Sequence, residues 1–358
     1  MDKLKKRERL PDVLRGFAIF LVILGHCIQE GSGIDFKGNA MYFYDEVYQF
    51  IYSFHMPLFM MISGYFAWDS IDRVKEKSEK WKLLAKRSAV LLIPILGWTS
   101  IEHIQLWVEQ GRAYVAFWSI PLFVKYFFIR FLTNTWFLWA VFWCFLIVFF
   151  MHCYFRDSII VYSVGFLLLF VIPDGMGLGA YKYMMPYFVA AFYYRGWQRS
   201  GRKQFQYLDR IKKSSDWTWI AMSGILFVGL FFQFDENSFI YLTGYKIIGK
   251  EVMRQLGIDF YRMLIGFVGA VFFILLWRKI LKMIPKLRFS VLTAIGKSSL
   301  GVYIISGYLI VALGDLLGEH LYPNYLLNLL QAIVITLVSY FITTILKRIP
   351  VLKWLVGQ

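Results

Sequence analysis

Apolar runs of about 16 to 24 residues recur along the whole chain, and each is long enough to cross a bilayer as a helix. Of the 358 residues, 59% are hydrophobic and only 17% are charged. A soluble protein of this size carries more charge than that. The sequence therefore predicts an all-α, polytopic membrane protein.

The apolar runs number about ten, and no stretch between them has the composition of a soluble domain. We therefore predict one integral-membrane domain over residues 1–358. The predicted spans lie near residues 12–29, 49–68, 84–107, 135–155, 158–173, 183–197, 217–234, 261–281, 293–314 and 325–346.

Short basic clusters separate the apolar runs and account for most of the net charge of +16. With the amino terminus in the cytoplasm, the cytoplasmic segments hold well over half of the 39 lysines and arginines. This bias follows the positive-inside rule and predicts an even number of spans with both termini in the cytoplasm. Topology and contact with membrane lipid explain the charge, so no nucleic-acid partner is expected.

The segment 113–132 is apolar enough to be counted as a further span. Counting it would invert every later loop and place two basic clusters outside the cell. It also contains Pro121, Lys125 and Arg130. We therefore expect an interfacial or re-entrant segment on the outer side.

The first apolar run carries three ionisable residues, which are costly inside a membrane and usually functional. Arg15 and His26 are about 20° from exact alignment on a helix and about 16 Å apart along its axis. A ligand stretched along this face can touch both. His26 has the side chain of a general base at neutral pH, or else it hydrogen-bonds to a neighbouring helix. Asp12 can pair with Arg15 and orient it toward an anionic ligand, or the pair is an interfacial one at the helix entry.

Other candidate residues lie in the next two runs. His55 is a second polar group in an apolar segment, where Pro57 and the Ser63–Gly64 pair indicate a kinked, closely packed helix. Glu102 and His103, toward the outer end of the third run, can bind hydroxyl groups of an external acceptor or lie in the wet interface.

The basic run that includes Arg73 and Arg87 fixes topology and can attract a phosphate-rich cofactor. No metal-binding, phosphate-loop or serine-nucleophile motif is present in the sequence.

Four stretches resemble motifs of the membrane acyltransferase-3 family, which includes bacterial polysaccharide O-acetyltransferases. DVLRGFAIFLVILGH ends at His26, and SFHMPLFMMISGYF begins at Ser53. TWFLWA and IGKSSLGVYIISGYL are similar to weaker, later motifs. The resemblance runs from about residue 8 to about residue 345. Ser306 stands where many members carry a histidine, which leaves the polar group at that position open.

The resemblance implies a ten-helix bundle in a bacterial plasma membrane. The implied donor is a cytoplasmic acyl-CoA, by default acetyl-CoA, and the implied acceptor is a hydroxyl of a cell-surface glycan or its lipid-linked precursor. The essential arginine and histidine of the family correspond to Arg15 and His26. Arg73 and Arg87 are then expected to bind donor phosphates with Arg15.

The sequence leaves two other classes of function open. A transporter or flippase for a glycan or lipid-linked sugar predicts interrupted helices in corresponding halves of the chain, and the sequence does not show them. A structural scaffold fits poorly with an arginine and a histidine aligned on one face of a membrane helix.

Overall fold

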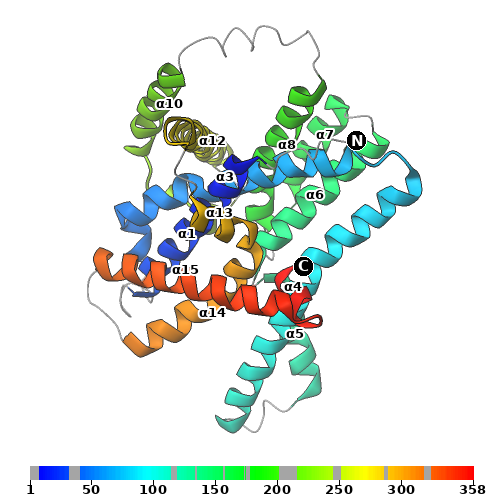
Figure 1. Cartoon of the computed structure of the whole chain (residues 1–358), viewed down its shortest axis with the longest axis vertical. Coiled ribbons are helices and arrows are strands. Elements are labelled where there is room, and N and C mark those ends of the chain that lie inside the picture. Colours follow the sequence, from blue (N-terminus) through cyan, green and yellow to red (C-terminus); the bar gives the residue numbers. More distant parts are fainter. Residues whose placement is uncertain are drawn as a thin grey trace.

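The computed structural model describes residues 8–31, 41–113, 119–133, 135–155, 158–172, 174, 178–200, 216–244, 251–285, 289–317 and 324–358. Within these ranges every regular element is a helix, as predicted (Figure 1). The long helices are α1 (Arg9–Gly31), α3 (Glu46–Ile71), α4 (Lys77–Ala113), α6 (Trp136–Tyr154), α8 (Leu178–Ser200), α12 (Val252–Met283), α14 (Ser299–Leu317) and α15 (Tyr325–Arg348). Shorter helices are α5 (Ile120–Thr133), α7 (Ile159–Val171), α10 (Asp216–Phe231), α11 (Ile240–Thr243) and α13 (Ser290–Lys297), with 3-10 turns at Met41–Tyr44 (η1), Glu236–Ser238 (η4) and Leu352–Val356 (η5).

The predicted count of ten spans is not confirmed. Six described helices are long and apolar enough to cross a membrane, namely α1, α3, α4, α6, α12 and α15. A seventh span forms if α13 and α14, which meet at an angle of 87°, are taken together. The remaining predicted spans correspond to α7 and α10, which are short, and to α8, which carries Lys182, Arg195 and Arg199.

The two helices that carry the strongest motifs lie at the centre of the bundle. Helix α1 contacts α3, α12, α13, α14 and α15, and Figure 1 shows it enclosed by other helices. Helix α3 contacts α8, α12 and α6 in addition to α1. Proline is tolerated in a first helical turn, so Pro11 does not interrupt α1. Asp45 caps α3 by accepting a hydrogen bond of 2.7 Å from the backbone N–H of Tyr48.

Close helix approach in the core depends on small residues. A Cβ atom on Gly64 of α3 would overlap the backbone carbonyl of Phe188 on α8. A Cβ atom on Gly296 of α13 would overlap the carbonyl of Asp12 on α1. Pro57 lies inside α3 and packs against Gly266 of α12. The predicted close packing around Gly64 is therefore present.

Of the segment 113–132, predicted to be interfacial or re-entrant, residues 120–132 lie in α5 and Ala113 ends α4, while residues 114–118 lie outside the described ranges. Helix α5 has no buried residue and packs against α4. The Nε2 atom of His103 lies 2.9 Å from the carbonyl oxygen of Phe123, and Glu102 pairs with Arg130 at 3.1 Å. These two contacts hold α5 against α4.

Candidate functional site

A cavity of about 320 Å³ lies between α1, α3, α4, α6, α13 and α14, and residues of α8 and of the C-terminal stretch 356–358 also line it. Arg15 from α1 and Arg87 from α4 both line it, although they are far apart in the sequence. Lys297, at the end of α13, is a third cation in the lining. The structure therefore brings two of the predicted donor-binding residues to one cavity.

Residues of α3 hold the two arginines. The guanidinium carbon of Arg15 lies 4.4 Å from the centre of the Phe66 ring, a cation–π contact. Arg87 donates a hydrogen bond of 2.6 Å to the hydroxyl of Ser70. Phe66 and Ser70 are one helical turn apart, so one face of α3 orients both cations.

The break between α13 and α14 adds further polar groups to this end of the cavity. Ser298 and Ser299 line the cavity at the break, and the hydroxyl of Ser298 accepts a hydrogen bond of 2.9 Å from Lys347. The first backbone N–H groups of a helix carry partial positive charge, and α14 begins at Ser299. Among the described residues that line the cavity there is no aspartate or glutamate. This end is suited to an anion.

The rest of the lining is apolar and largely aromatic. The wall facing α1 is formed by side chains of α3, α6, α8 and α14, among them Phe59, Phe137, Phe145, Phe188 and Tyr303. Val22 lines the cavity on α1 itself, seven residues beyond Arg15 and on the same helical face. The cavity therefore follows the predicted face of α1 from a cationic end to an apolar end.

His26 lies on this face, one turn beyond Val22, but it does not line the cavity. Its side chain is half-buried, and Nδ1 lies 3.3 Å from the amide oxygen of Gln29. A neutral ring with its proton on Nδ1 donates to that oxygen and presents the lone pair of Nε2. The neighbouring Gly25 packs against the ring of Tyr52 on α3. Arg15 and His26, which were predicted to contact the two ends of one ligand, thus share a face of α1. The cavity covers the part of that face nearer Arg15.

His55 is buried on α3, where Tyr52 contacts both its ring and Gly25, the residue before His26. Its Nδ1 donates a hydrogen bond of 2.7 Å to the carbonyl oxygen of Ile51, which leaves Nε2 as an acceptor. The His55 ring also makes an edge contact with Tyr52, with centroids 4.7 Å apart. The structure therefore brings the two predicted histidines together beyond the apolar end of the cavity.

The other predicted site residues lie outside the cavity. Asp12 is buried one turn before Arg15, with its carbonyl against Gly296. Arg73 is exposed and near Arg87. Glu102 and His103 join α4 to α5 and do not line the cavity.

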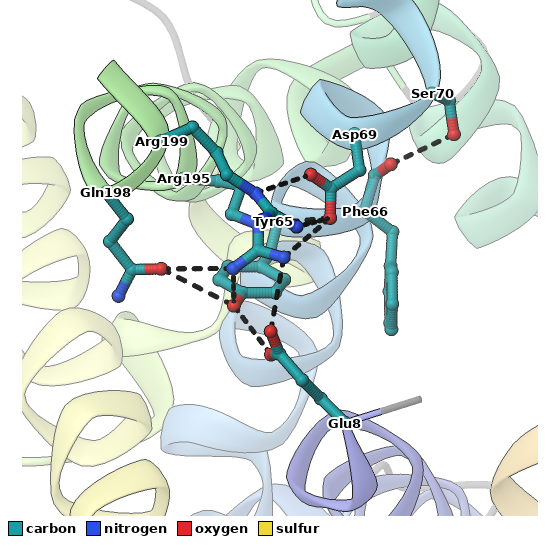
Figure 2. A network of polar contacts seen from close by, with 8 residues as sticks. All are labelled: Glu8, Tyr65, Phe66, Asp69, Ser70, Arg195, Gln198 and Arg199. Atoms are coloured by element: carbon teal, nitrogen blue, oxygen red, sulfur yellow. Dashed lines mark hydrogen bonds and ion pairs between the residues drawn. The ribbon is translucent and has the colours of Figure 1, made fainter. Parts of the chain in front are cut away.

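A paired ionic network that the sequence did not indicate lies beside the cavity (Figure 2). Arg195 of α8 contacts Asp69 at 2.7 Å and Glu8 at 3.2 Å, and it hydrogen-bonds to the hydroxyl of Tyr65. Arg199 joins the same aspartate at 3.2 Å. In Figure 2, Tyr65 and Asp69 point toward α8, while Phe66 and Ser70 point to another side of α3. We refer to Glu8, Tyr65, Asp69, Arg195 and Arg199 as the α3–α8 network.

The sequence also did not indicate Lys297 and Ser299 as site residues. Both lie in the stretch that resembles a late family motif, but no spacing along the chain relates α13 and α14 to α1. Their position at a helix break inside an otherwise apolar run was the available signal. In the described part of the chain, no group of three or more histidine, cysteine or carboxylate side chains is arranged to hold a metal ion.

A family model matches most of this chain, and two known proteins match parts of it. A family described as an acyltransferase domain matches residues 10–348. The nodulation protein NolL of Mesorhizobium japonicum is 27% identical over 54% of this chain and 50% of its own length. NolL of Sinorhizobium fredii is 31% identical over 38% of this chain and 34% of its own length. The matches thus span half or less of the curated relatives, and no solved structure matches the chain.

Proposed function

The chain belongs to this family of acyltransferases, and from that membership we propose a specific reaction. An acyl group, by default acetyl, moves from cytoplasmic acyl-CoA to a hydroxyl of a cell-surface glycan or its lipid-linked precursor. The observation that carries the proposal is the cavity that follows one face of α1 from Arg15 toward His26.

The chemistry of the cavity supports acyl-CoA as the donor. The phosphates of coenzyme A match the end where Arg15, Arg87 and Lys297 meet the start of α14. The thioester arm then extends along Val22 toward the histidines. Exposed Arg73, near Arg87, attracts the phosphates as they approach. Buried Asp12 supports the turn of α1 that presents Arg15.

In the direct route, His26 acts as the general base. The acceptor hydroxyl oxygen attacks the thioester carbonyl carbon while Nε2 of His26 takes the hydroxyl proton. The carbon–sulfur bond breaks, and the leaving thiolate takes the proton back from the imidazolium. The products are the acyl ester and free coenzyme A. His55, which also presents Nε2, binds the acceptor hydroxyl in this arrangement.

In the covalent route, Nε2 of His26 attacks the carbonyl first and coenzyme A leaves with one proton. The acceptor hydroxyl then displaces the histidine from the acyl-imidazole. Rapid denaturation at neutral pH of the enzyme mixed with radiolabelled acetyl-CoA, in the absence of acceptor, distinguishes the routes, because an acyl-imidazole is hydrolysed quickly in acid. Label on the parent protein that is absent from the His26→Ala variant supports the covalent route. A parent enzyme that is active but carries no label supports the direct route.

The catalytic assignment is tested by single-turnover transfer from labelled acetyl-CoA to a glycan acceptor in reconstituted membranes. His26→Ala is expected to lower the rate by at least about 100-fold, because it removes the base or the acyl carrier. The matched control is His152→Phe, which keeps an aromatic ring next to Trp68, outside the cavity. Transfer by His26→Ala at the parent rate contradicts the assignment.

The acceptor class is tested by mass spectrometry of surface glycans from cells with and without the gene. We expect the loss of one acyl increment from a single glycan species. Unchanged glycans, together with glycan transport in the absence of any acyl donor, favour the transporter alternative. Among the described helices only α13 and α14 form a bent pair, whereas a transporter of that kind is expected to have such breaks in corresponding halves.

A further inference from the structure

The apolar end of the cavity is lined by four side chains from four helices. These are Val22 on α1, Phe59 on α3, Phe137 on α6 and Tyr303 on α14, and all four line the cavity. The Phe59 and Phe137 rings meet edge to face, with centroids 5.2 Å apart. The Phe137 and Tyr303 rings lie 6.1 Å apart in a similar arrangement. We refer to these four residues as the far wall.

Helix register places the far wall at a defined depth. Val22 lies seven residues beyond Arg15 on α1, which is about 10 Å along the axis. Phe59 lies seven residues before Phe66 on α3, and Phe66 is the residue that stacks on Arg15. Two helices running in opposite directions therefore put the wall at the same distance from the cationic end.

The histidines lie directly behind this wall. His26 is one turn beyond Val22 on α1, and His55 is one turn before Phe59 on α3, about 6 Å farther in each case. Neither histidine lines the cavity, whereas Phe59 and Phe137 do. A thioester bound from the cationic end must therefore bring its carbonyl carbon to the far wall in order to reach His26.

Resting on the proposed function, we propose that Phe59 and Phe137 form a filter that restricts the transferred acyl group to short chains. With the carbonyl carbon held at the wall, the acyl chain lies among the rings of Phe59, Phe137 and Tyr303. These side chains are already packed, since Phe59 and Phe137 are 8% and 4% exposed. Each additional methylene must displace a packed ring, and in tight apolar sites one methylene changes the rate of reaction by 10-fold or more.

The filter is tested with a series of donors, namely acetyl-, propionyl-, butyryl- and hexanoyl-CoA. For the parent enzyme we expect kcat/KM to fall by about 10-fold for each added methylene. Phe137→Ala opens the wall and is expected to make butyryl-CoA at least as good a donor as acetyl-CoA. The control is Phe145→Ala, which enlarges the same cavity two turns away on α6, nearer the cationic end, and should keep the parental order of donors.

A second variant and a second measurement guard against misfolding. Phe59→Leu is a milder change in the same wall and should shift the preference toward propionyl-CoA. Binding of unreactive S-ethyl-, S-butyl- and S-hexyl-CoA needs no turnover, and Phe137→Ala should bind the longer analogues at least 10-fold more tightly than the parent does.

The outcomes separate the filter from the proposed reaction. If the parent enzyme transfers acetyl but Phe137→Ala and Phe59→Leu both keep its chain-length profile in transfer and binding, the filter is wrong and the proposed function stands. If the parent enzyme neither binds the analogues nor transfers an acyl group from any donor, the proposed function fails and the filter fails with it.

Discussion

Two groups of arginines flank the last turns of α3, and they differ in what surrounds them. Toward α8, Arg195 and Arg199 share the carboxylate of Asp69 in the α3–α8 network (Figure 2). On the cavity side, Arg15 stacks on Phe66 and Arg87 bonds to Ser70. The described lining of the cavity contains no carboxylate side chain.

We propose that this difference separates arginines that stabilise the fold from arginines that bind a ligand. A buried arginine with carboxylate partners satisfies its charge inside the protein, so the α3–α8 network ties together the ends of α1, α3 and α8. Arg15 and Arg87 instead line a cavity, where an anion that enters can reach them. We therefore propose that the same residue type has two roles beside two faces of α3.

The largest effect is expected from loss of a cavity arginine. Arg87→Gln should lower kcat/KM for acetyl-CoA by about 30- to 100-fold, because one charged hydrogen bond to a phosphate contributes about 2 to 3 kcal/mol. Arg199→Gln is the matched control from the paired group and should change kcat/KM by less than about 3-fold. Steady-state transfer in reconstituted membranes measures both values. Equal losses of kcat/KM in the two variants would contradict the distinction between the two groups of arginines.

An intermediate effect is expected from breaking the paired group, and it should appear as lost stability. Asp69→Asn removes the charge that neutralises Arg195, whose side chain is 7% exposed. We expect the free energy of unfolding to fall by about 1 to 3 kcal/mol in a denaturant titration in detergent. The KM for acetyl-CoA should stay within about twofold of the parent value. A large rise in the KM for acetyl-CoA with unchanged stability would show that the α3–α8 network takes part in donor binding.

The smallest effect is expected at the residue that orients a cavity cation without carrying charge. Ser70→Ala removes the hydroxyl that accepts the 2.6 Å hydrogen bond from Arg87. A neutral partner of this kind contributes about 0.5 to 1.5 kcal/mol, so the KM for acetyl-CoA should rise by about 2- to 10-fold with little change in kcat. A fall in kcat at constant KM would indicate that Arg87 acts on the reacting group and not on donor binding.

The sequence predicted those parts of the geometry that depend on a single helix. The spacing of Arg15 and His26 places them on one face of α1 whatever surrounds it, and the cavity follows that face. The helical class and the close packing at Gly64 also followed from local patterns. The approach of Arg87 to the cavity was predicted only from its charge and from the basic run in which it lies.

Features that depend on contacts between helices could not be predicted in this way. Lys297 reaches the cavity because α13 packs closely on α1, and no periodicity relates the two helices. Asp69 and Arg195 pair across more than a hundred residues.

Glu102 and His103 were expected to bind an acceptor, but they pack α5 against α4, so that role stays a prediction. The span count was uncertain for a physical reason, since α7 and α10 are shorter than a full crossing.

The central claim is that the cationic end of the cavity holds coenzyme A, and equilibrium binding of coenzyme A to the purified protein tests it most directly. The account predicts saturable binding by the parent protein, about 100-fold weaker binding by Arg15→Gln, and unchanged binding by Arg199→Gln. Binding of coenzyme A by folded Arg15→Gln protein with the parental affinity would contradict it.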